Sequence, residues 1–320
     1  SDMFLVPDPR TLAIIPWRPQ QGKVARLLCD IKKHDGSQFT GDPRYILKKT
    51  LAKAAREGYT LNVGPECEFF LFHTDNRGRP TTVTHDVAGY CDMAPIDQGE
   101  NARREIIMTL EEMGIEVEAS HHESATGQHE IDFKYTDALT AADEIMTFKL
   151  VVKVIAQRNG LHATFMPKPL PHQSGSGMHI NMSLTKDGVN LFYDPTARDG
   201  ISETAKHFAA GILKHIKGIT AIANPLVNSY KRFVPGYEAP VHIAWSYSNR
   251  SPLLRIPVPQ GERTRLEVRS PDPTCNPYLT LALLLEAGME GLKNKLPLPE
   301  PVDFNTYFLT PEQERAMSIE

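Results

Sequence analysis

The chain has 320 residues, of which 41% are hydrophobic and 23% are charged, and its formal net charge is -4 at pH 7. This length allows a sizeable buried core in one large domain or two, and the slightly acidic balance excludes the basic surface that nucleic-acid-binding proteins need. No apolar run approaches the ~20 residues that cross a bilayer, and we expect no leader segment and no membrane partner. The four cysteines form no Cys-x-x-Cys pair, which favours a reducing cytoplasm over a disulfide framework or a structural zinc.

The first forty residues predict two short strands, Leu12–Pro16 and Val24–Asp30, joined by a turn around Gln21-Gly22. Two strands alone do not form a stable sheet. They either pair with a later segment or are the remainder of a domain that precedes this chain.

From Asp42 onwards the pattern predicts helices and strands in mixed order. Asp42-Pro43 has the chemistry of an N-cap and a first helical position, so the first helix is expected to run to Gly58. Further helices are predicted at Asp97–Met113, Asp137–Asn159, Ser202–Ala223 and Asn276–Asn294. Strands are predicted at Glu68–Phe72, Ile115–Ser120, Glu130–Tyr135, Met178–Leu184 and Thr264–Ser270. Because strict βαβ alternation is absent, the fold class is α+β with helices on one side of a sheet, and Asn228–Arg255 reads as long functional loops.

Alternation along these strands separates an apolar face from a polar one. The residues on the polar faces are Glu66 and Glu68; Glu130, Asp132 and Lys134; His179, Asn181 and Ser183; and Arg263, Arg265, Glu267 and Arg269. The polar face of one antiparallel strand often does no more than face water. Together, however, these faces carry mostly Glu, His and Arg, whereas a solvated face uses Lys freely. The combination indicates a lined cavity.

Two of these carboxylates suggest two metal ions. Glu66 and Glu68 lie about 6–7 Å apart along the strand, too far to chelate one ion comfortably, so each is expected to serve a different ion. Carboxylates with one imidazole favour Mg²⁺ or Mn²⁺, and the glycine-flanked His179 is the most ligand-like histidine, whereas the doublet at 121–122 is more typical of an orienting or solvated pair. Two metals and clustered arginines indicate phosphoryl chemistry, although the chain has no GxxxxGK[ST] loop. The residues alone therefore predict a two-metal phosphoryl-transfer or hydrolytic enzyme.

Six motifs spread along the whole chain carry a family resemblance. They are Gly64-Pro65-Glu66-Cys67-Glu68-Phe69-Phe70, His121-His122-Glu123 through Gly127-Gln128-His129-Glu130, Gly175-Ser176-Gly177-Met178-His179, Lys231-Arg232 through Ala239-Pro240, Asn249-Arg250-Ser251 and Arg265-Leu266-Glu267-Val268-Arg269. In this order they resemble bacterial glutamine synthetase of type I, and the short interval between the first two motifs is similar to the α-type. The resemblance implies an antiparallel curved sheet, a half-barrel lined with metal ligands and backed by helices, as a catalytic domain over 41–320. Residues 1–40 would be the C-terminal remnant of a β-grasp domain.

The resemblance also implies the reaction. It is the ATP-dependent ligation of ammonia to the side-chain carboxylate of L-glutamate through γ-glutamyl phosphate, which gives glutamine, ADP and phosphate. Two or more Mg²⁺ or Mn²⁺ ions are implied in each site. The first ion would be held by Glu68, Glu123 and Glu130, and the second by Glu66, His179 and Glu267.

The remaining site residues follow from the same resemblance. Glutamate would be contacted by Ser174, Gly175, Arg232, Glu238, Arg250 and Arg269, and ATP by Glu118, Ser183, Arg250, Arg255 and Arg265. Ser174 stands where the family usually has Asn. The catalytic residues would be Arg250, Arg269 and Glu238, and Glu238, on a loop that closes over the site, would accept a proton from ammonium.

The family assembles as a dodecamer of two stacked hexamers with active sites between subunits, which implies a homo-oligomer here. We expect the chain to be truncated at both ends relative to the family, without most of the β-grasp domain, which donates an ammonium-binding Asp to the neighbouring subunit. The 320-residue chain alone is therefore expected to be weakly active or inactive.

Three other interpretations remain open at this point. The acceptor could be a polyamine or another amine, since the arginines define only the acid partner. A non-catalytic relative, a binding protein of the same fold, is disfavoured because all six metal-ligand positions and Glu238 are present. A metal-dependent hydrolase has little use for so many arginines. Under the ligase interpretation, Glu267→Gln abolishes activity while Asp86→Asn is harmless.

Overall fold

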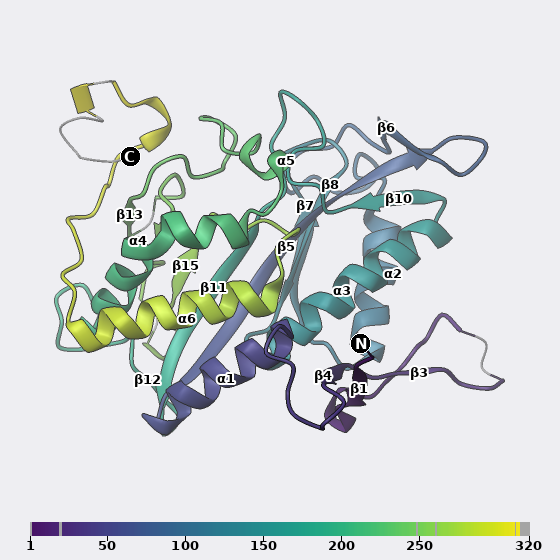
Figure 1. Cartoon of the computed structure of the whole chain (residues 1–320). Coiled ribbons are helices and arrows are strands. Elements are labelled where there is room, and N and C mark those ends of the chain that lie inside the picture. The colour runs from purple at the N-terminus through teal and green to yellow at the C-terminus, as the bar shows by residue number, and fades with distance from the viewer. Residues whose placement is uncertain (1, 19–20, 248, 260, 311, 314–320) are drawn as a thin grey trace.

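The structure, a computed structural model, describes residues 2–18, 21–247, 249–259, 261–310 and 312–313. A large sheet forms around the 15-residue strand β5 (Thr60–Thr74). Its other strands are β6 (Pro80–Thr84), β7 (Val117–His122), β8 (Gln128–Phe133), β9 (Thr136–Asp137), β10 (Leu161–Thr164), β11 (Met178–Lys186), β12 (Val189–Asn190), β13 (Trp245–Ser246), β14 (Leu254–Arg255) and β15 (Leu266–Val268). The strand order is β13-β14-β15-β11-β5-β8-β7, with β6, β9 and β10 also paired to β5 and β12 to β11 (Figure 1).

The pairing in this sheet is antiparallel except between β13 and β14. In the described part of the chain the strand path ends at β13 on one side and β7 on the other, so the sheet is open and not a closed barrel. The predicted α+β class with an antiparallel sheet is confirmed.

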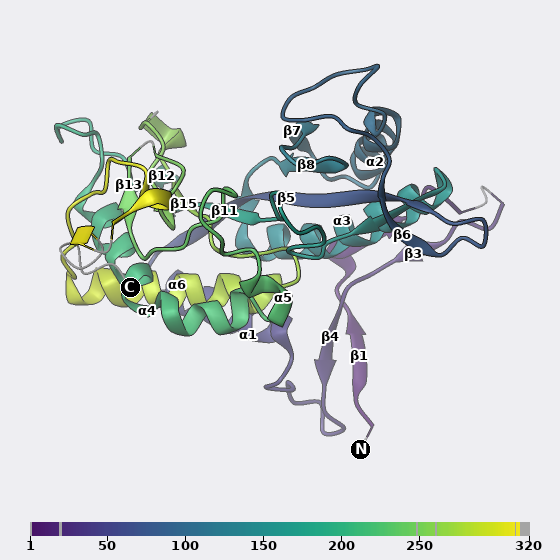
Figure 2. The ribbon, with the colours of Figure 1, turned by 90° about the horizontal axis from the view of Figure 1, so that it is seen from above.

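Helices cover one face of the sheet. They are α1 (Pro43–Arg56), α2 (Glu100–Glu112), α3 (Ala138–Arg158), α4 (Glu203–Ala223), α5 (Val227–Tyr230) and α6 (Pro277–Asn294). α1 and α3 pack on β5, while α6 packs against α1, α3 and α4 (Figures 1 and 2). No helix in the described residues is long and apolar enough to cross a membrane.

Polar N-caps set the starts of four helices as predicted. The side chains of Asp42, Asp137, Ser202 and Asn276 each accept a hydrogen bond from a backbone N–H of the first turn that follows them. Such caps satisfy donors that the helix itself leaves unpaired.

The apolar face of the central strand forms the middle of the core. Leu61, Val63, Cys67 and Phe69 of β5 are all buried against the helices. Cys67 therefore points away from Glu66 and Glu68, as strand alternation predicts.

Several elements differ from their predicted extents. The predicted strand Glu68–Phe72 is only the middle of β5, whose earlier part contains Gly64 and Pro65, residues that disfavour an interior strand. The short strands β6, β9, β10, β12, β13 and β14 are not predicted, because two to five residues carry too little pattern and depend on pairing with distant strands. The predicted loop segment Asn228–Arg255 accordingly contains β13 and β14, together with most of α5.

The N-terminal segment forms two small sheets of its own. β1 (Phe4–Pro7) pairs with β4 (Cys29–Lys32), and β2 (Ala13–Ile14) pairs with β3 (Ala25–Arg26). The predicted strand Val24–Asp30 is thus divided between β3 and β4, and β1 is not predicted. The β1–β4 ribbon projects away from the large sheet (Figure 2).

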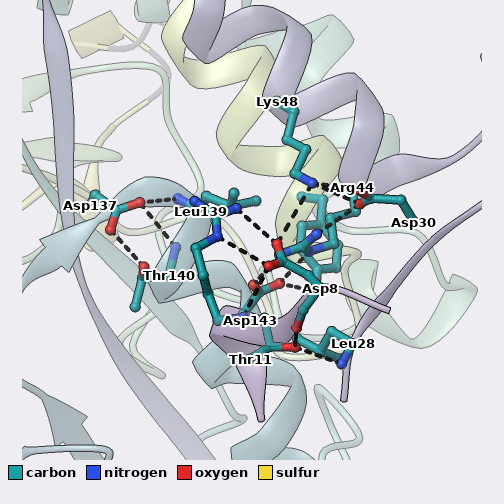
Figure 3. A network of polar contacts seen from close by, with 12 residues as sticks. Asp8, Thr11, Leu28, Asp30, Arg44, Lys48, Asp137, Leu139, Thr140 and Asp143 are labelled. Carbon is teal, nitrogen blue, oxygen red and sulfur yellow. Dashed lines mark hydrogen bonds and ion pairs between the residues drawn. The ribbon is translucent and has the colours of Figure 1, made fainter. Parts of the chain in front are cut away.

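A buried arginine ties this segment to the helices. Arg44 of α1 donates hydrogen bonds to Asp8 at 3.0 Å, to Asp30 at 2.7 Å and to both carboxylate oxygens of Asp143 on α3 at 3.0 and 2.8 Å (Figure 3). Its side chain is only 4% exposed. We call these residues, with two further polar partners, the Arg44 network: Asp8, Asp30, Arg44, Lys48, Asp143 and Tyr278.

Candidate functional site

The register of the sheet gathers the acidic residues of its polar face. Glu66 lies opposite His179 of β11 on one side and Asp132 of β8 on the other. Glu68 lies opposite Glu130. Because residues opposite each other in antiparallel strands are close neighbours, the predicted polar faces meet in one place.

These side chains line a cavity of about 260 Å³, which we call the acidic cavity. It is lined by Glu66, Glu68, Tyr90, His121, Glu123, Glu130, Asp132, Gly175, His179, Arg232, Glu238, Arg250, Arg255, Glu267 and Arg269. All six predicted metal ligands and all three predicted catalytic residues are therefore in one cavity. Ser174, a predicted substrate contact, is half-buried and not among the lining residues.

A second cavity of about 480 Å³, the adjoining cavity, shares Glu66 and Asp132 with the first. Three predicted ATP contacts, Glu118, Ser183 and Arg265, line it. The other two, Arg250 and Arg255, line the acidic cavity. The predicted nucleotide residues thus lie on both sides of the boundary between the cavities.

One group of potential metal ligands comes from three neighbouring strands. Glu66, His179 and Glu267 each bring one ligand atom within 4.8 Å of the others. His179 Nδ1 donates to Glu66 Oε2 at 3.0 Å, and its buried Nε2 has no hydrogen-bond partner. Burial lowers the pKa of His179, so the imidazole is neutral. Its Nδ1 lies beside Glu66 and Glu267, whereas the free Nε2 lies 3.8 Å from Glu68 Oε1 and is available to a cation between these groups.

Both carboxylates of this group have hydrogen-bond donors beside them. Burial acts to raise the pKa of Glu66, but hydrogen bonds from His179 and from the Asn181 amide, at 2.8 Å, outweigh it and lower the pKa to about 2. Glu267 accepts hydrogen bonds from Arg255 and Arg269. Glu66 is therefore ionised, and the Glu267 carboxylate faces two guanidinium groups.

Glu68 and Glu123 are held by partners on the other side of the cavity. Glu68 Oε2 accepts from the Gln128 amide at 2.8 Å and from the Gly177 N–H at 2.9 Å. Glu123 accepts from His121 at 2.9 Å and from the backbone N–H of the next residue at 2.8 Å. Although Glu66 and Glu68 share one face of β5, their carboxylates therefore have different neighbours.

Negative charge is in excess in this half of the cavity. Burial, and then repulsion from Glu123, raises the pKa of Glu68 well above its usual value. Burial and then Glu68 do the same to Glu130, and burial is the main cause that raises the pKa of Asp132 to about 7. A ligand atom of Glu130 lies within 4.8 Å of His121 and Asp132, a grouping that no sequence motif suggests. Oxygen-rich donors that repel one another, together with the neutral imidazole of His179, fit a hard divalent cation.

Two glycines allow a buried arginine to approach the ligands. Arg232 is 2% exposed and donates to the carbonyl oxygens of Ser270 and Arg269 at 3.0 and 3.1 Å. A Cβ on Gly177 would lie 2.5 Å from Arg232 Nη2, and a Cβ on Gly175 would lie 2.2 Å from a backbone oxygen. Gly177 thus leaves room for the guanidinium and Gly175 for the Pro167 carbonyl oxygen, and the positive charge of Arg232 lies in the cavity wall.

Glu238 sits on an exposed loop in an unusual backbone conformation. Its φ is +58°, a left-handed value that costs a non-glycine residue of order 1–3 kcal/mol and is concentrated at functional sites. Its carboxylate accepts a hydrogen bond from Ser124 Oγ at 3.1 Å. The loop is also held by Lys168, whose Nζ lies 4.0 Å from the centre of the Tyr237 ring.

The cavity contains residues that no motif assigns. Alternation along β8 places Asp132 on the polar face without giving it a role. His121, from the doublet interpreted as orienting or solvated, lines the cavity, whereas His122 is fully buried. Tyr90 reaches the cavity from the long segment between β6 and α2, which carries no pattern that would reveal it.

The fold and the cavity together define an α+β catalytic domain with an acidic, arginine-rimmed site on an antiparallel sheet. The family profile described as "Glutamine synthetase, catalytic domain" matches residues 40–320. The chain is 63% identical over 315 residues to a glutamine synthetase of Clostridium saccharobutylicum, covering 98% of this chain and 71% of that protein. It is 58% identical over 321 residues to one of Staphylococcus aureus strain MW2, covering 100% of this chain and 72% of that protein. The chain belongs to the glutamine synthetase family.

Solved structures agree with this assignment. Plasmodium falciparum glutamine synthetase has a TM-score of 0.85 at 31% identity, over 94% of this chain and 64% of that one. An ADP complex of GmaS has a TM-score of 0.87 at 34% identity, over 100% of this chain and 73% of that one. The resemblance drawn from the six motifs is confirmed, and with it the ligase class: ATP-dependent formation of glutamine from glutamate and ammonia, with the divalent metal and ATP use of the family.

Proposed function

We propose that the acidic cavity is where this ligation takes place, with Mg²⁺ or Mn²⁺ ions held by two sets of ligands. The first set is Glu68, Glu123 and Glu130, and the second is Glu66, His179 and Glu267. The observation that carries the proposal is the unbalanced charge: buried carboxylates that raise one another's pKa lie beside a histidine nitrogen without a partner. When bound, the ions would neutralise phosphate oxygens of ATP and the γ-carboxylate of glutamate.

The arginines of the cavity wall are proposed to bind the anionic parts of the substrates. Arg232 is fixed by two backbone carbonyls and is suited to hold a carboxylate of glutamate. Arg250 and Arg269, proposed as catalytic, would contact glutamate and stabilise charge on the transferred phosphoryl group. Gly175 leaves room for the amino acid. Ser174 does not line the acidic cavity and is proposed only as a contact next to it.

Glu238 is proposed to accept a proton from ammonium and to help exclude water. Its loop borders the acidic cavity, and its carboxylate is anchored to Ser124 beside Glu123. Exclusion of water matters because an acyl phosphate is hydrolysed readily. A strained, exposed loop is suited to move between open and closed positions.

The adjoining cavity is proposed to hold ATP. Glu118, Ser183 and Arg265 line it, and Arg255 and Arg250 would meet the phosphates where the two cavities join. The ADP complex of the structurally similar GmaS supports a nucleotide in this fold.

We propose a homo-oligomer of two stacked hexamers with active sites at subunit interfaces. Exposed apolar side chains favour a contact there: Val87, Met93 and Ile96 are 84%, 76% and 50% exposed and belong to the segment that brings Tyr90 to the cavity. Residues 1–40 are proposed as the end of a β-grasp domain and 41–320 as the catalytic domain, because the N-terminal sheets do not pair with the large one in the described residues. Four free cysteines favour the cytoplasm.

Calorimetric titration tests the site. Mn²⁺ is titrated first, followed by methionine sulfoximine with and without ATP. Two ions per chain and inhibitor binding that depends on ATP are expected, and Glu267→Gln should remove one ion, while the exposed Glu116→Gln should remove none. Fewer than two ions, or inhibitor binding indifferent to ATP, would contradict the proposal. Phosphate release with ammonium and with putrescine identifies the amine; the chain alone is expected to give only a low rate.

A further inference from the structure

A buried polar cluster lies on the opposite face of the β7–β8 hairpin from the acidic cavity. Because side chains alternate along strands, His122 and His129 point away from His121 and Glu130. They meet residues of the segment before α2 and one residue of α2 itself. We call the group the Asp86 cluster: His85, Asp86, Asp97, Arg103, His122 and His129.

This cluster has the composition of a metal site but not its charge balance. His85, Asp86, Asp97 and His129 each bring a ligand atom within 4.8 Å of the others. Arg103, however, donates to His129 Nδ1 at 2.8 Å and lies 2.8 Å from a carboxylate oxygen of Asp97. The guanidinium already supplies the positive charge that an ion would bring, so we do not expect the cluster to bind a metal ion.

Asp86 differs from the other members of this cluster because each of its two carboxylate oxygens has two polar neighbours. Oδ1 accepts from the Gly127 N–H at 3.0 Å and from His122 Nε2 at 3.2 Å. Oδ2 accepts from the Gln98 N–H at 3.2 Å and faces His85 Nε2 at 2.9 Å. The side chain is 0% exposed. Each oxygen therefore accepts a hydrogen bond from one backbone N–H and lies beside one imidazole.

These contacts hold both ends of the turn that contains Glu123. His122, at one end, donates from Nδ1 to the carbonyl oxygen of Glu123 at 2.7 Å. Gly127, at the other end, precedes Gln128, whose amide donates to Glu68 at 2.8 Å. The position of the Asp86 carboxylate thus determines where the turn places Glu123 and, through Gln128, where Glu68 is held.

We propose that Asp86 is a positioning residue for the metal ion assigned above to Glu68, Glu123 and Glu130. The inference rests on the proposed function of the acidic cavity and adds a residue outside that cavity to it. Outer contacts that orient metal ligands are typically worth 10- to 100-fold in metal affinity.

The hydrogen-bond pattern requires a carboxylate at this position. An Asn side chain has one acceptor oxygen and one donor nitrogen. Whichever way it is turned, its NH₂ group faces the N–H of either Gly127 or Gln98, and that N–H loses its acceptor. Under this proposal Asp86→Asn is no longer expected to be harmless.

The experiment measures Mn²⁺ binding to the full chain by calorimetry, well below the unfolding temperature of each variant. Asp86→Asn should raise the dissociation constant of one of the two ions about 10- to 100-fold and leave the other within about threefold. His122→Asn is a milder variant, because its amide can still donate to the Glu123 carbonyl; the same ion should weaken about 3- to 10-fold. Asp143→Asn, a buried carboxylate in the Arg44 network, should lower Tm and leave both affinities unchanged.

Three results would overturn the inference. The first is a folded Asp86→Asn or, if that variant does not fold, a folded His122→Asn that binds both ions with wild-type affinity. The second is an equal weakening of both ions, which would show a general structural effect. The third is a wild-type chain that binds fewer than two ions; this also contradicts the proposed function, whereas the first two leave it intact.

Discussion

The Arg44 network and the acidic cavity bury charged side chains in opposite ways. In the network every carboxylate faces a cation: hydrogen bonds from Arg10 and Arg44 hold the pKa of Asp8 well below its usual value. In the cavity, burial and neighbouring carboxylates push the pKa values of Glu68 and Glu130 upwards. A buried charge that is paired within the fold is costly to unpair, whereas a charge left unbalanced is available to a ligand.

Removal of the central cation of the network should give the largest effect. Arg44→Met leaves Asp8, Asp30 and Asp143 without their shared partner, which should lower the free energy of unfolding by about 3–5 kcal/mol in urea titrations. Arg10→Met is the control, because Arg10 pairs with the same Asp8 but its side chain is 75% exposed, and it should cost under about 1 kcal/mol. Equal losses in the two variants would show that burial does not set the strength of these pairs.

Removal of one carboxylate from the cavity should act in the opposite direction on stability. Glu130→Gln relieves repulsion with Glu68 and Asp132, so the Tm of the metal-free protein should rise by about 1–2 °C, or about 1 kcal/mol. The affinity for Mn²⁺ should fall about 100-fold, or about 2.7 kcal/mol, in calorimetric titrations. Glu116→Gln on the same side of the sheet, where the carboxylate is exposed and paired with Lys134, should change neither. A lower Tm for the Glu130 variant would mean that its charge is balanced after all.

One carboxyl group near the Arg44 network resembles those of the cavity. Burial, and then repulsion from Asp137 and Asp143, raises the pKa of Glu144 from 4.5 to about 7. The folded chain therefore holds a proton that the unfolded chain releases between these pH values, and the stability from Glu144 is present at pH 4.5 and lost as the pH rises through 7. Glu144→Gln should increase the free energy of unfolding at pH 8 by about 1 kcal/mol, after allowance for solvent around a half-buried group, and change nothing at pH 4.5.

Urea titrations at the two pH values measure this difference. Mn²⁺ affinity should be the same in the Glu144 variant and the wild-type chain, because the residue does not line the acidic cavity. A gain of equal size at both pH values would contradict the titration of Glu144 as its cause.

The smallest effect concerns the loop of Glu238. Ser124→Ala removes the hydrogen bond from the hydroxyl to Glu238 at 3.1 Å, worth about 0.5–1 kcal/mol. It also removes a longer contact of the hydroxyl with Glu123 at 3.3 Å, but Glu123 keeps the backbone N–H of residue 124 at 2.8 Å. The residual rate of glutamine formation should fall about two- to fivefold, without a change in Mn²⁺ affinity. Ser37→Ala, another exposed serine with a side-chain hydrogen bond, should leave the rate unchanged. Loss of Mn²⁺ affinity in the Ser124 variant would place this serine with the ligands and not with the loop.

Much of the site follows from local chemistry in the sequence. Alternation predicts that Glu66 and Glu68 share a face and that Cys67 enters the core, because strand geometry repeats every two residues. Helix starts at Asp42, Asp137, Ser202 and Asn276 are readable because the capping group and its target are within three residues of each other.

Other features depend on contacts between distant residues and leave no local signal. Tyr90 reaches the cavity through a segment without periodicity, and Asp86 meets His122 across 36 residues. The β1–β4 pairing likewise joins segments too short to show a pattern. Buried polar groups such as Asp86 are the hardest to find, because a sequence does not show which oxygens are satisfied.

The central strand β5 also has a consequence for how the protein folds. Its 15 residues pair with β11 on one edge and with β8 on the other, so Gly64 meets Asn181 and Glu68 meets Glu130 across long stretches of chain. Pairings between residues so far apart in sequence form slowly, since a large loop must close before any contact is gained. A shift of the β5 register by one residue would turn Cys67 to the polar face and both Glu66 and Glu68 into the core. Metal ions that bind the correctly registered glutamates should therefore favour that register during refolding.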